Sequence, residues 1–268
     1  MYGSSKKSMA ELHDSLAARQ GDADLSQVSA DLLSVAALLA RSTTLRSTLC
    51  DGGIVAAAKR GIVDQLLSTQ LSSEGLSIVQ KVVASRWSHD RDIVEALETL
   101  GAQAAFIEAQ RHGSLDQVED ELFKFGRALE ASDELQLTMT DPSISGEAKA
   151  GIVRDLLAGG SPVTVSLLSF LVSHLQGRGP IAAVANLNSL AAAQRGQVLA
   201  AISTAVVLTA DQQTRMVSVL SRLTGRQVHL NIEVVPDVIG GIVVRIGDEV
   251  IDGSVSARLE QARRALVG

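Results

Sequence analysis

The sequence predicts a mainly α protein: two tandem duplicated helical bundles that share a long connecting helix, followed by a small α/β C-terminal domain. Three observations support this fold class. The chain of 268 residues is 46% hydrophobic but only 2% aromatic, so Ala, Leu, Val and Ile must build its cores, and these residues pack closely between helices. An internal repeat occupies much of the chain. After Ala193 the spacing of apolar residues changes from helical to alternating, which indicates strands.

The repeat predicts the domain organisation. Residues 25–67 align with residues 115–157 without a gap, and 17 of the 43 positions are identical. Residues 76–97 pair more loosely with residues 165–187. Self-similarity at a fixed period is typical of a duplicated structural unit. We therefore expect a first bundle at 1–90, a second bundle at 91–195 and a small α/β domain at 196–268.

Each copy is predicted to contain the same series of helices. The elements of the first copy, with their counterparts in the second, begin near Leu25 (Leu115), Leu45 (Leu135), Ile54 (Ile144), Leu76 (Val165) and Ile93 (Ile181). Apolar stripes at helical spacing support two of them, Leu115-Val118-Leu122-Phe125-Leu129 and Ile54-Ala58-Ile62-Leu66. Asp141 followed by Pro142 resembles a helix start. One long helix, from about Asp90 to Arg111, connects the two copies.

The C-terminal domain is predicted from alternation and turn signals. Strands are expected at 198–208, 227–234, 242–246 and 249–251, with Gly247-Asp248 as the turn of a hairpin. A helix at 209–225 begins with a capping box formed by Thr209 and Gln212 and ends at Gly225. A last helix is expected at 254–267.

Charge and hydropathy exclude several classes of function. The net charge is −6 and the pI is about 5.4, so the chain lacks the density of cations that binding to nucleic acid requires. No apolar run approaches the length of a membrane span, and we expect no direct membrane insertion. Cys50, the single cysteine, is interpreted as a small apolar filler.

The sequence offers no pattern typical of catalysis. The five histidines do not stand at metal-ligand spacing, and no serine or cysteine has the context of an activated nucleophile. The acidic run 119–121 is interpreted as a solvated helix face. The glycine-rich stretches 159–164 and 239–248 lack the Lys-Ser/Thr of a phosphate-binding loop. We therefore expect no catalytic, cofactor-binding or metal site and no small-molecule substrate.

The end of the chain carries a recognisable signature. Its residues are Pro236, Ile239, Gly240, Gly241, Val243, Gly247, Asp248, Ile251, Asp252, Gly253, Ser254 and Leu259. This series resembles the C-terminal signature of the δ subunit of bacterial F-type ATP synthases, the family of the mitochondrial oligomycin-sensitivity-conferring protein. The second repeat copy is similar to the N-terminal helical domain of that family. Val235 stands where the family usually has Asp, and the additional first copy resembles the extended δ chains of actinobacteria.

The resemblance implies a non-catalytic stator, or peripheral stalk, subunit. In this family the helical domain binds amphipathic N-terminal helices of α subunits of the catalytic head, and the C-terminal domain joins a b-type stalk. It also implies a peripheral position on the cytoplasmic face of the plasma membrane. The family's groove lies between the first and fifth helices of its helical domain, which corresponds here to Leu97, Leu100, Ala104, Ile107, Leu167, Leu168 and Leu171.

Three expectations remain open from the sequence. The first copy is expected to present a second groove that holds another α-subunit helix or a second stalk chain. The alternative for the whole chain is a freestanding helical adaptor or regulator related to this family. An enzyme that uses the acidic residues of 119–122 or of 90–92 as general acid and base would need a pocket that raises the pKa of one carboxyl.

Overall fold

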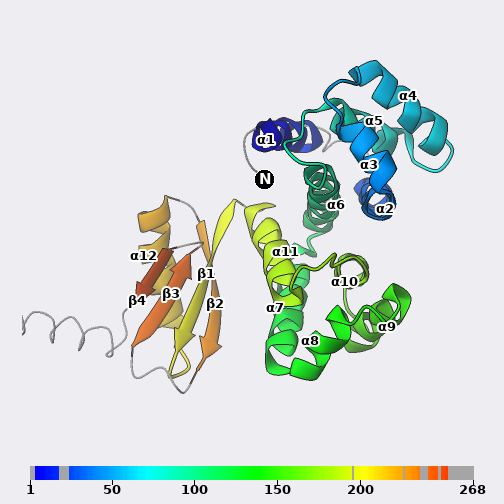
Figure 1. Cartoon of the computed structure of the whole chain (residues 1–268). Coiled ribbons are helices and arrows are strands. Elements are labelled where there is room, and N and C mark those ends of the chain that lie inside the picture. The colour runs from blue at the N-terminus through cyan, green and yellow to red at the C-terminus, as the bar shows by residue number, and fades with distance from the viewer. Residues whose placement is uncertain are drawn as a thin grey trace, which may run out of the picture. The chain divides into compact units, whose positions relative to one another are not determined.

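The computed structural model describes residues 4–17, 24–194, 196–225, 227–235, 241–246 and 249–252. The chain divides into two compact units, Met1–Ala191 and Ala192–Gly268, and each is described by itself. The first unit is helical, and the second contains a four-stranded sheet (Figure 1). The predicted fold class, mainly α with a small α/β unit at the C-terminus, is confirmed.

The first bundle is built from short amphipathic helices. Its elements are α1 (Ser4–Ala17), α2 (Leu25–Arg41), α3 (Thr43–Cys50), α4 (Ala56–Leu67) and α5 (Ser73–Ala84). Helices α2 to α5 correspond to predicted elements, whereas α1 precedes the aligned repeat and is not among them. The apolar stripe predicted on α4 is wrong by one position, since Lys59, Val63 and Leu67 are buried while Leu66 is 48% exposed.

The second bundle repeats this series. Its elements are α7 (Leu115–Ala131), α8 (Asp133–Thr140), α9 (Gly146–Leu156), α10 (Pro162–Ser173) and α11 (Pro180–Gln194). Helices α2 and α7 both have 17 residues, α3 and α8 both have 8, and α5 and α10 both have 12. The stripe predicted on α7 is confirmed, because all five of its residues are buried.

The long helix α6 (Asp92–Arg111) belongs to the cores of both bundles. One set of its side chains lies in the core of the first bundle, namely Val94, Leu97, Leu100, Ala104 and Ile107. Another set lies in the core of the second, namely Ala102, Ala105, Phe106 and Ala109. Figure 1 shows α6 between the two groups of helices. Because buried apolar side chains lie on two sides of α6, neighbours must cover both sides, and the predicted shared helix is confirmed.

The α6 helix also approaches α2 closely. At Gly101 an added Cβ would lie 2.9 Å from Cγ of Leu33, which is closer than carbon atoms pack. Glycine therefore permits the contact between the two helices. Leu33 itself lies in the core of the second bundle, so α2 contributes to both cores as well.

The loops of the two copies use the same local hydrogen bonds. Ser42 and Ser132 cap α3 and α8, where their hydroxyls accept from the backbone N–H of Leu45 and Leu135. The carboxylate of Asp51 accepts from the N–H of Gly53 at 2.8 Å, and that of Asp141 accepts from the N–H of Ser143 at the same distance. Such Asx turns explain why Asp recurs at this position.

This turn corrects the predicted start of the third helix in the second copy. Asp141 follows the last residue of α8, and Pro142 lies in a turn. The helix α9 begins later, at Gly146, where the hydroxyl of Ser145 accepts from the N–H of Ala148 at 3.2 Å. A serine cap satisfies an N–H group that the first helical turn leaves free.

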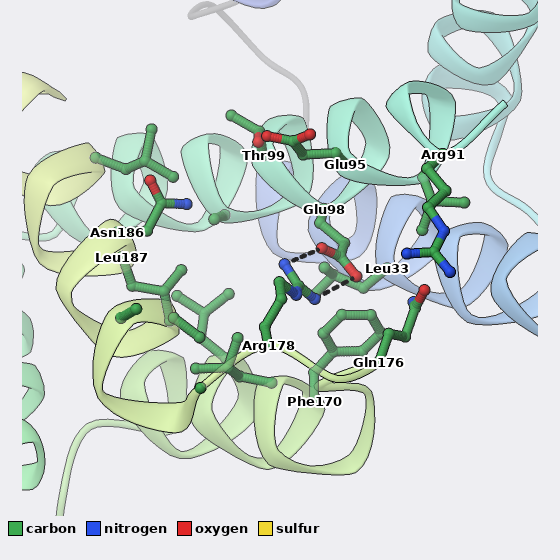
Figure 2. A pocket seen from close by; sticks show the side chains of 18 residues that line it. Leu33, Arg91, Glu95, Glu98, Thr99, Phe170, Gln176, Arg178, Asn186 and Leu187 are labelled. Atoms are coloured by element: carbon green, nitrogen blue, oxygen red, sulfur yellow. Dashed lines mark hydrogen bonds and ion pairs between the residues drawn. The ribbon is translucent and has the colours of Figure 1, made fainter. Parts of the chain in front are cut away.

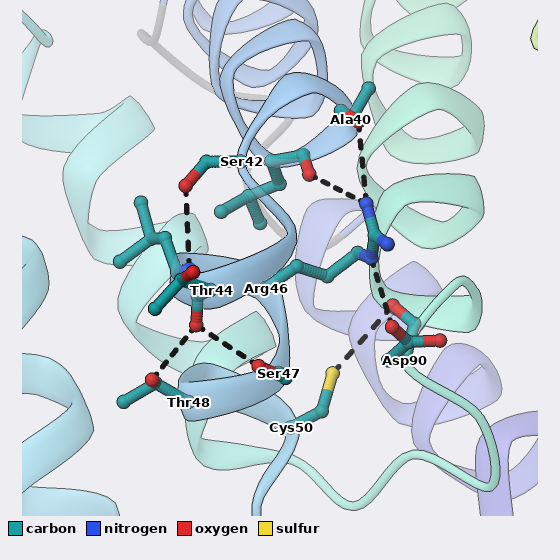
Figure 3. Close-up of polar contacts among 10 residues, drawn as sticks. Ala40, Ser42, Thr44, Arg46, Ser47, Thr48, Cys50 and Asp90 are labelled. Atoms are coloured by element: carbon teal, nitrogen blue, oxygen red, sulfur yellow. Dashed lines mark hydrogen bonds and ion pairs between the residues drawn. The ribbon is translucent and has the colours of Figure 1, made fainter.

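One arginine gives the first bundle an additional link (Figure 3). Arg46 Nε donates to the Asp90 carboxylate at 3.1 Å, and its Nη1 donates to the carbonyls of Leu39 and Ala40. The Cys50 thiol donates to the carbonyl of Asp90 at 3.7 Å. Burial raises the pKa of Cys50 to about 11, so the thiol stays protonated and serves as a weak donor as well as a filler.

The second unit contains a sheet with strand order β2-β1-β3-β4. Its elements are β1 (Gln197–Thr204), α12 (Ala210–Thr224), β2 (Gln227–Val234), β3 (Ile242–Ile246) and β4 (Glu249–Asp252). Strand β1 pairs parallel with β2 and antiparallel with β3. The predicted capping box of Thr209 and Gln212 is confirmed. The predicted first strand, 198–208, is too long. Strand β1 ends at Thr204, and the side chains of Val206 and Val207 beyond it are exposed.

The glycine signature lies partly outside the described residues. Gly241 has φ +91°, a conformation that favours glycine, and it immediately precedes β3. Asp252 ends β4. The register pairs Ile246 with Glu249, so two residues connect β3 and β4, as a hairpin requires. Outside the described residues lie Pro236, Ile239, Gly240, Gly247, Asp248, Gly253, Ser254 and the predicted helix 254–267.

Candidate functional site

The second bundle contains a cavity of about 480 Å³ between α6, α10 and α11 (Figure 2). We call it the α6–α10 groove. Its lining on α6 follows one face of the helix through Arg91, Val94, Glu95, Glu98, Thr99 and Ala102. Residues 176–179 close it between α10 and α11, and Leu33 of α2 reaches it from the first bundle.

Most of the wall opposite α6 is apolar. Leu167, Phe170 and Leu171 line it from α10, and Leu187 and Leu190 line it from α11. Phe170 is partly buried and touches the cores of both bundles. A concave apolar wall of this kind fits the apolar face of an amphipathic helix.

One ion pair crosses the groove. Arg178 Nη1 lies 2.8 Å from one carboxylate oxygen of Glu98, and Nη2 donates to the other at 3.1 Å. Figure 2 shows the two side chains pointing toward one another. Burial raises the pKa of Glu98 above its ordinary value, and the Arg178 guanidinium partly offsets this rise. Paired, the two groups form a bidentate contact that fixes both side chains.

Hydrogen bonds to the end of α10 and to the residues after it fix the loop that carries Arg178. Arg178 donates to the carbonyls of Leu175 and His174, both at 3.1 Å. The His174 ring stacks on Phe170 with 4.5 Å between ring centroids, and its Nδ1 donates to the Phe170 carbonyl at 2.9 Å. Burial lowers the pKa of His174, so the neutral ring is favoured. The polar end of the groove is therefore built by one connected set of contacts.

The acidic run 119–121 is not the solvated face that its composition predicts. Glu119 is only 8% exposed, and burial raises its pKa. Glu121 accepts from the N–H of Ser161 with both carboxylate oxygens, at 3.0 and 3.1 Å, and so caps the start of α10. Asp120 alone of the three is exposed and pairs with Lys124 at 2.6 Å. The run serves the packing of the bundle.

The structure separates the seven residues predicted for partner binding. Leu167 and Leu171 line the α6–α10 groove, and Leu168 is buried in the core beneath it. The remaining four belong to the core of the first bundle and do not line the groove, namely Leu97, Leu100, Ala104 and Ile107. The helices α6 and α10 were the expected ones. The face of α6 differs because the first bundle covers its larger apolar side chains.

Several groove residues were not predicted. Glu98 and Arg178 stand 80 positions apart, so no local pattern connects them. Phe170 carries a usable signal, since it is one of only four phenylalanines and lies on an apolar helix. Leu33 lies in the other repeat copy and contributes through the close contact of α2 with α6.

Within the described ranges, no group of three or more His, Cys, Asp or Glu side chains is arranged to hold a metal ion. In the same ranges, no single helix has both the length and the apolarity to cross a membrane, and α2 with α3 meets that test only as a pair bent by 107°.

The chain has relatives along almost its whole length. A protein named ATP synthase subunit delta from Streptomyces griseus subsp. griseus is 41% identical over 246 residues, or 91% of each chain. One of that name from Streptomyces avermitilis is 39% identical over 99% of this chain and 98% of its own. One from Thermobifida fusca is 35% identical over 100% of both. The first repeat copy is therefore present in these relatives.

The matching family model covers most of the second copy and the C-terminal unit. The family described as ATP synthase delta (OSCP) subunit matches residues 99–266. A chain in the cryo-EM structure of the Toxoplasma gondii mitochondrial ATP synthase hexamer is 30% identical, covers 64% of this chain and 98% of its own, and gives a TM-score of 0.40.

Proposed function

Because this chain belongs to the ATP synthase delta (OSCP) subunit family, we propose that its α6–α10 groove binds an amphipathic N-terminal helix of an α subunit. The protein is a structural, non-catalytic subunit of the peripheral stalk of F-type ATP synthase. Family membership thus decides against a freestanding adaptor and against an enzyme. Through the complex the protein is associated with a membrane, and we place it on the cytoplasmic face.

The observation that carries the proposal is the contrast between the two walls of the groove. The α10 and α11 wall offers Phe170, Leu171 and Leu187, whereas the α6 wall offers Glu95 and Glu98. An amphipathic helix lying between them would bury its apolar stripe on the first wall and turn its polar flank toward the second. A basic residue on that flank would complement Glu95, since Glu98 is already paired with Arg178, and this contact favours one orientation of the helix.

Binding of a helix here is testable without disturbing the core. Ala182 and Asn186 line the groove on α11 but are exposed, so Ala182→Glu with Asn186→Glu adds charge where the apolar stripe would lie. We expect an α-subunit N-terminal peptide to bind this variant at least tenfold more weakly than wild type, about 1.4 kcal/mol, in a fluorescence titration. Leu137→Glu is the matched control, since Leu137 is 69% exposed on α8 outside the groove. Equal binding by the groove variant and the control would disprove the site.

For the C-terminal unit we propose contact with the distal end of the b-type stalk. Helix α12 supports this by presenting Val219 and Leu223, which are 47% and 69% exposed, on one side of the sheet unit. Exposed apolar side chains grouped on one helix are typical of an interface. The variant Leu223→Glu should reduce co-purification of the b chain and leave binding of the α peptide unchanged. Unchanged recovery of b would exclude α12 as the contact.

A further inference from the structure

The first bundle contains a second cavity at the corresponding position. It measures about 540 Å³ and lies between α1 and α5, with Arg60 from α4 at its edge; we call it the α1–α5 groove. Its lining on α1 is Ser4, Lys7, Ser8, Glu11, Leu12 and Ser15. These six positions have the same spacing as the six lining positions of α6, in steps of three, one, three, one and three residues. Helices α1 and α6 therefore each turn one face toward the groove of their own bundle.

The chemistry of the two grooves is opposite. Helices α5 and α10 have the same length, and Lys81 occupies the position on α5 that Phe170 occupies on α10. Each of these two side chains lines its own groove. The apolar wall of the second bundle is thus replaced in the first by a cation.

Positive charge dominates the described lining of the α1–α5 groove. Lys7, Arg60, Lys81 and Arg86 face one carboxylate, that of Glu11, although the whole chain carries a net charge of −6. All four cations are exposed. The contact of Glu11 with Lys7, at 4.0 Å between largely exposed groups, neutralises little of this charge, because such pairs are weak in water.

The walls of this groove are joined by hydrogen bonds. Ser8 Oγ donates to the Arg86 carbonyl at 2.9 Å, and Lys81 Nζ donates to Ser15 Oγ at 2.6 Å. These contacts tie α1 to α5 and to the segment that follows α5. From Ser4 to Ser15 the lining runs about 16 Å along α1, at about 1.5 Å per residue. The site is therefore elongated and suits a linear segment of about three helical turns.

We propose that the α1–α5 groove binds an acidic helical segment of a neighbouring ATP synthase subunit. The proposal rests on the proposed function, because it takes the corresponding α6–α10 groove as a helix-binding site. Charge complementarity selects the occupant: carboxylates along one helix face would complement Lys7, Lys81 and Arg86. An apolar stripe would find little to bury on, since Leu12 is only 5% exposed and belongs to the core.

A peptide titration with the full chain tests the charge requirement. The probe is a helical peptide of about 16 residues with Glu along one face, and its counterpart carries Gln at the same positions. We expect the Glu peptide to bind at least tenfold more tightly at low salt and to weaken as salt rises. The variant Lys81→Glu with Arg86→Glu should remove this preference, whereas Lys124→Glu with Arg127→Glu, an equal charge change on exposed cations of α7, should retain it.

Two results of that titration would overturn the proposal. One is equal affinity for the Glu and Gln peptides. The other is binding to phosphatidylglycerol vesicles that depends on Lys81 and Arg86 while the Glu peptide does not bind, which would assign the cations to a lipid surface.

Cross-linking in the intact complex tests the native partner. A carbodiimide joins amines directly to carboxylates, so Lys7 or Lys81 should become linked to an Asp or Glu of another subunit. The products should disappear in a Lys7→Gln, Lys81→Gln variant. An assembled complex in which both lysines link solely to carboxylates of their own chain overturns the proposal. Failure of Ala182→Glu with Asn186→Glu to weaken the α peptide would instead contradict the proposed function, so the two failures are distinguishable.

Discussion

The two bundles share a frame and differ in their grooves. The gap-free alignment of residues 25–67 with 115–157 covers α2 to α4 and α7 to α9. The grooves are lined mainly by α1 and α5 in one copy and by α6, α10 and α11 in the other. Identity therefore concentrates in the helices that build the cores and turns. The helices that line the two proposed binding grooves differ more, as Lys81 on α5 and Phe170 on α10 show.

The two bundles are not independent of each other, because they share the helix α6. Each bundle presents its own groove, yet α6 supplies core side chains to both bundles. A force applied to one groove is transmitted through a packed helix rather than a flexible linker. That property suits a stator subunit, which must resist rotation of the head without yielding at an internal joint.

The largest effect is expected from breaking the shared core. Phe106 is fully buried on α6, and Phe106→Ala should lower the free energy of unfolding by about 3–5 kcal/mol. Because α6 also completes the first bundle, hydrogen exchange should accelerate in α2 and α5 as well as in α7 and α10. Leu137→Ala, at a 69% exposed position, is the control and should change stability by less than about 0.5 kcal/mol. Exchange confined to the second bundle would show that the bundles unfold independently.

Asp31 and Glu121 occupy corresponding positions in the two bundles and should differ in how much they stabilise the fold. Asp31 is 3% exposed and accepts from the N–H and hydroxyl of Ser72, at 2.9 and 2.6 Å. At the corresponding position Glu121 accepts from the N–H of Ser161. Asp31→Ala leaves two donors of Ser72 without their acceptor, whereas Glu121→Ala leaves one donor of Ser161. We therefore expect the free energy of unfolding to fall by about 2–3 kcal/mol in Asp31→Ala and by about 1 kcal/mol in Glu121→Ala. Equal losses in chemical denaturation would show that burial of the carboxylate does not matter.

Sequence reasoning predicted the frame well because the frame is periodic. The shared helix and the capping box of Thr209 and Gln212 depend on spacing within a few turns, and the repeat is visible as identity between residues 25–67 and 115–157. The groove face of α6 was not predicted, because buried apolar residues lie on two sides of this helix and no period tells which side meets which bundle. The pair of Glu98 and Arg178 joins residues 80 positions apart, so it depends on tertiary contact alone.

A smaller difference separates Arg46 from its counterpart Gln136. Arg46 binds Asp90 and two carbonyls, whereas Gln136 Nε2 donates to the Leu129 carbonyl at 2.8 Å. Arg46→Gln gives the first copy the glutamine that the second has at this position. It should lower the free energy of unfolding by about 1 kcal/mol, a small loss because the ion pair of Arg46 with Asp90 is partly exposed. Asp90→Asn should have a similar effect, and the double variant should lose less than the sum of the two in thermal unfolding. Fully additive losses would mean that Arg46 and Asp90 do not act as a pair.

The smallest expected effect is a response to pH in one bundle. Burial lowers the pKa of His174 in the folded state, so folding favours the neutral ring. The stabilisation that the neutral His174 ring gives the folded state is fully present above the pKa of histidine in the unfolded chain, about 6.5. It is lost as pH falls from there through the lower pKa that His174 has in the folded protein. The pKa of Glu98 is raised in the folded protein, so its protonation at lower pH stabilises the folded state and opposes the effect of His174. The effect of His174 should therefore be measured just below about pH 6.5. In the first bundle the corresponding position is Ser85, which does not titrate there.

Hydrogen exchange can compare the two bundles within one molecule. On acidification from neutral pH, and after correction for intrinsic exchange rates, α10 should lose protection before α5. The substitution His174→Gln should remove that difference while it keeps a side-chain donor near the Phe170 carbonyl. If α10 of the variant still loses protection over the same range, the acid response belongs to another group, and the stack of His174 on Phe170 is a packing contact without a role in the pH dependence.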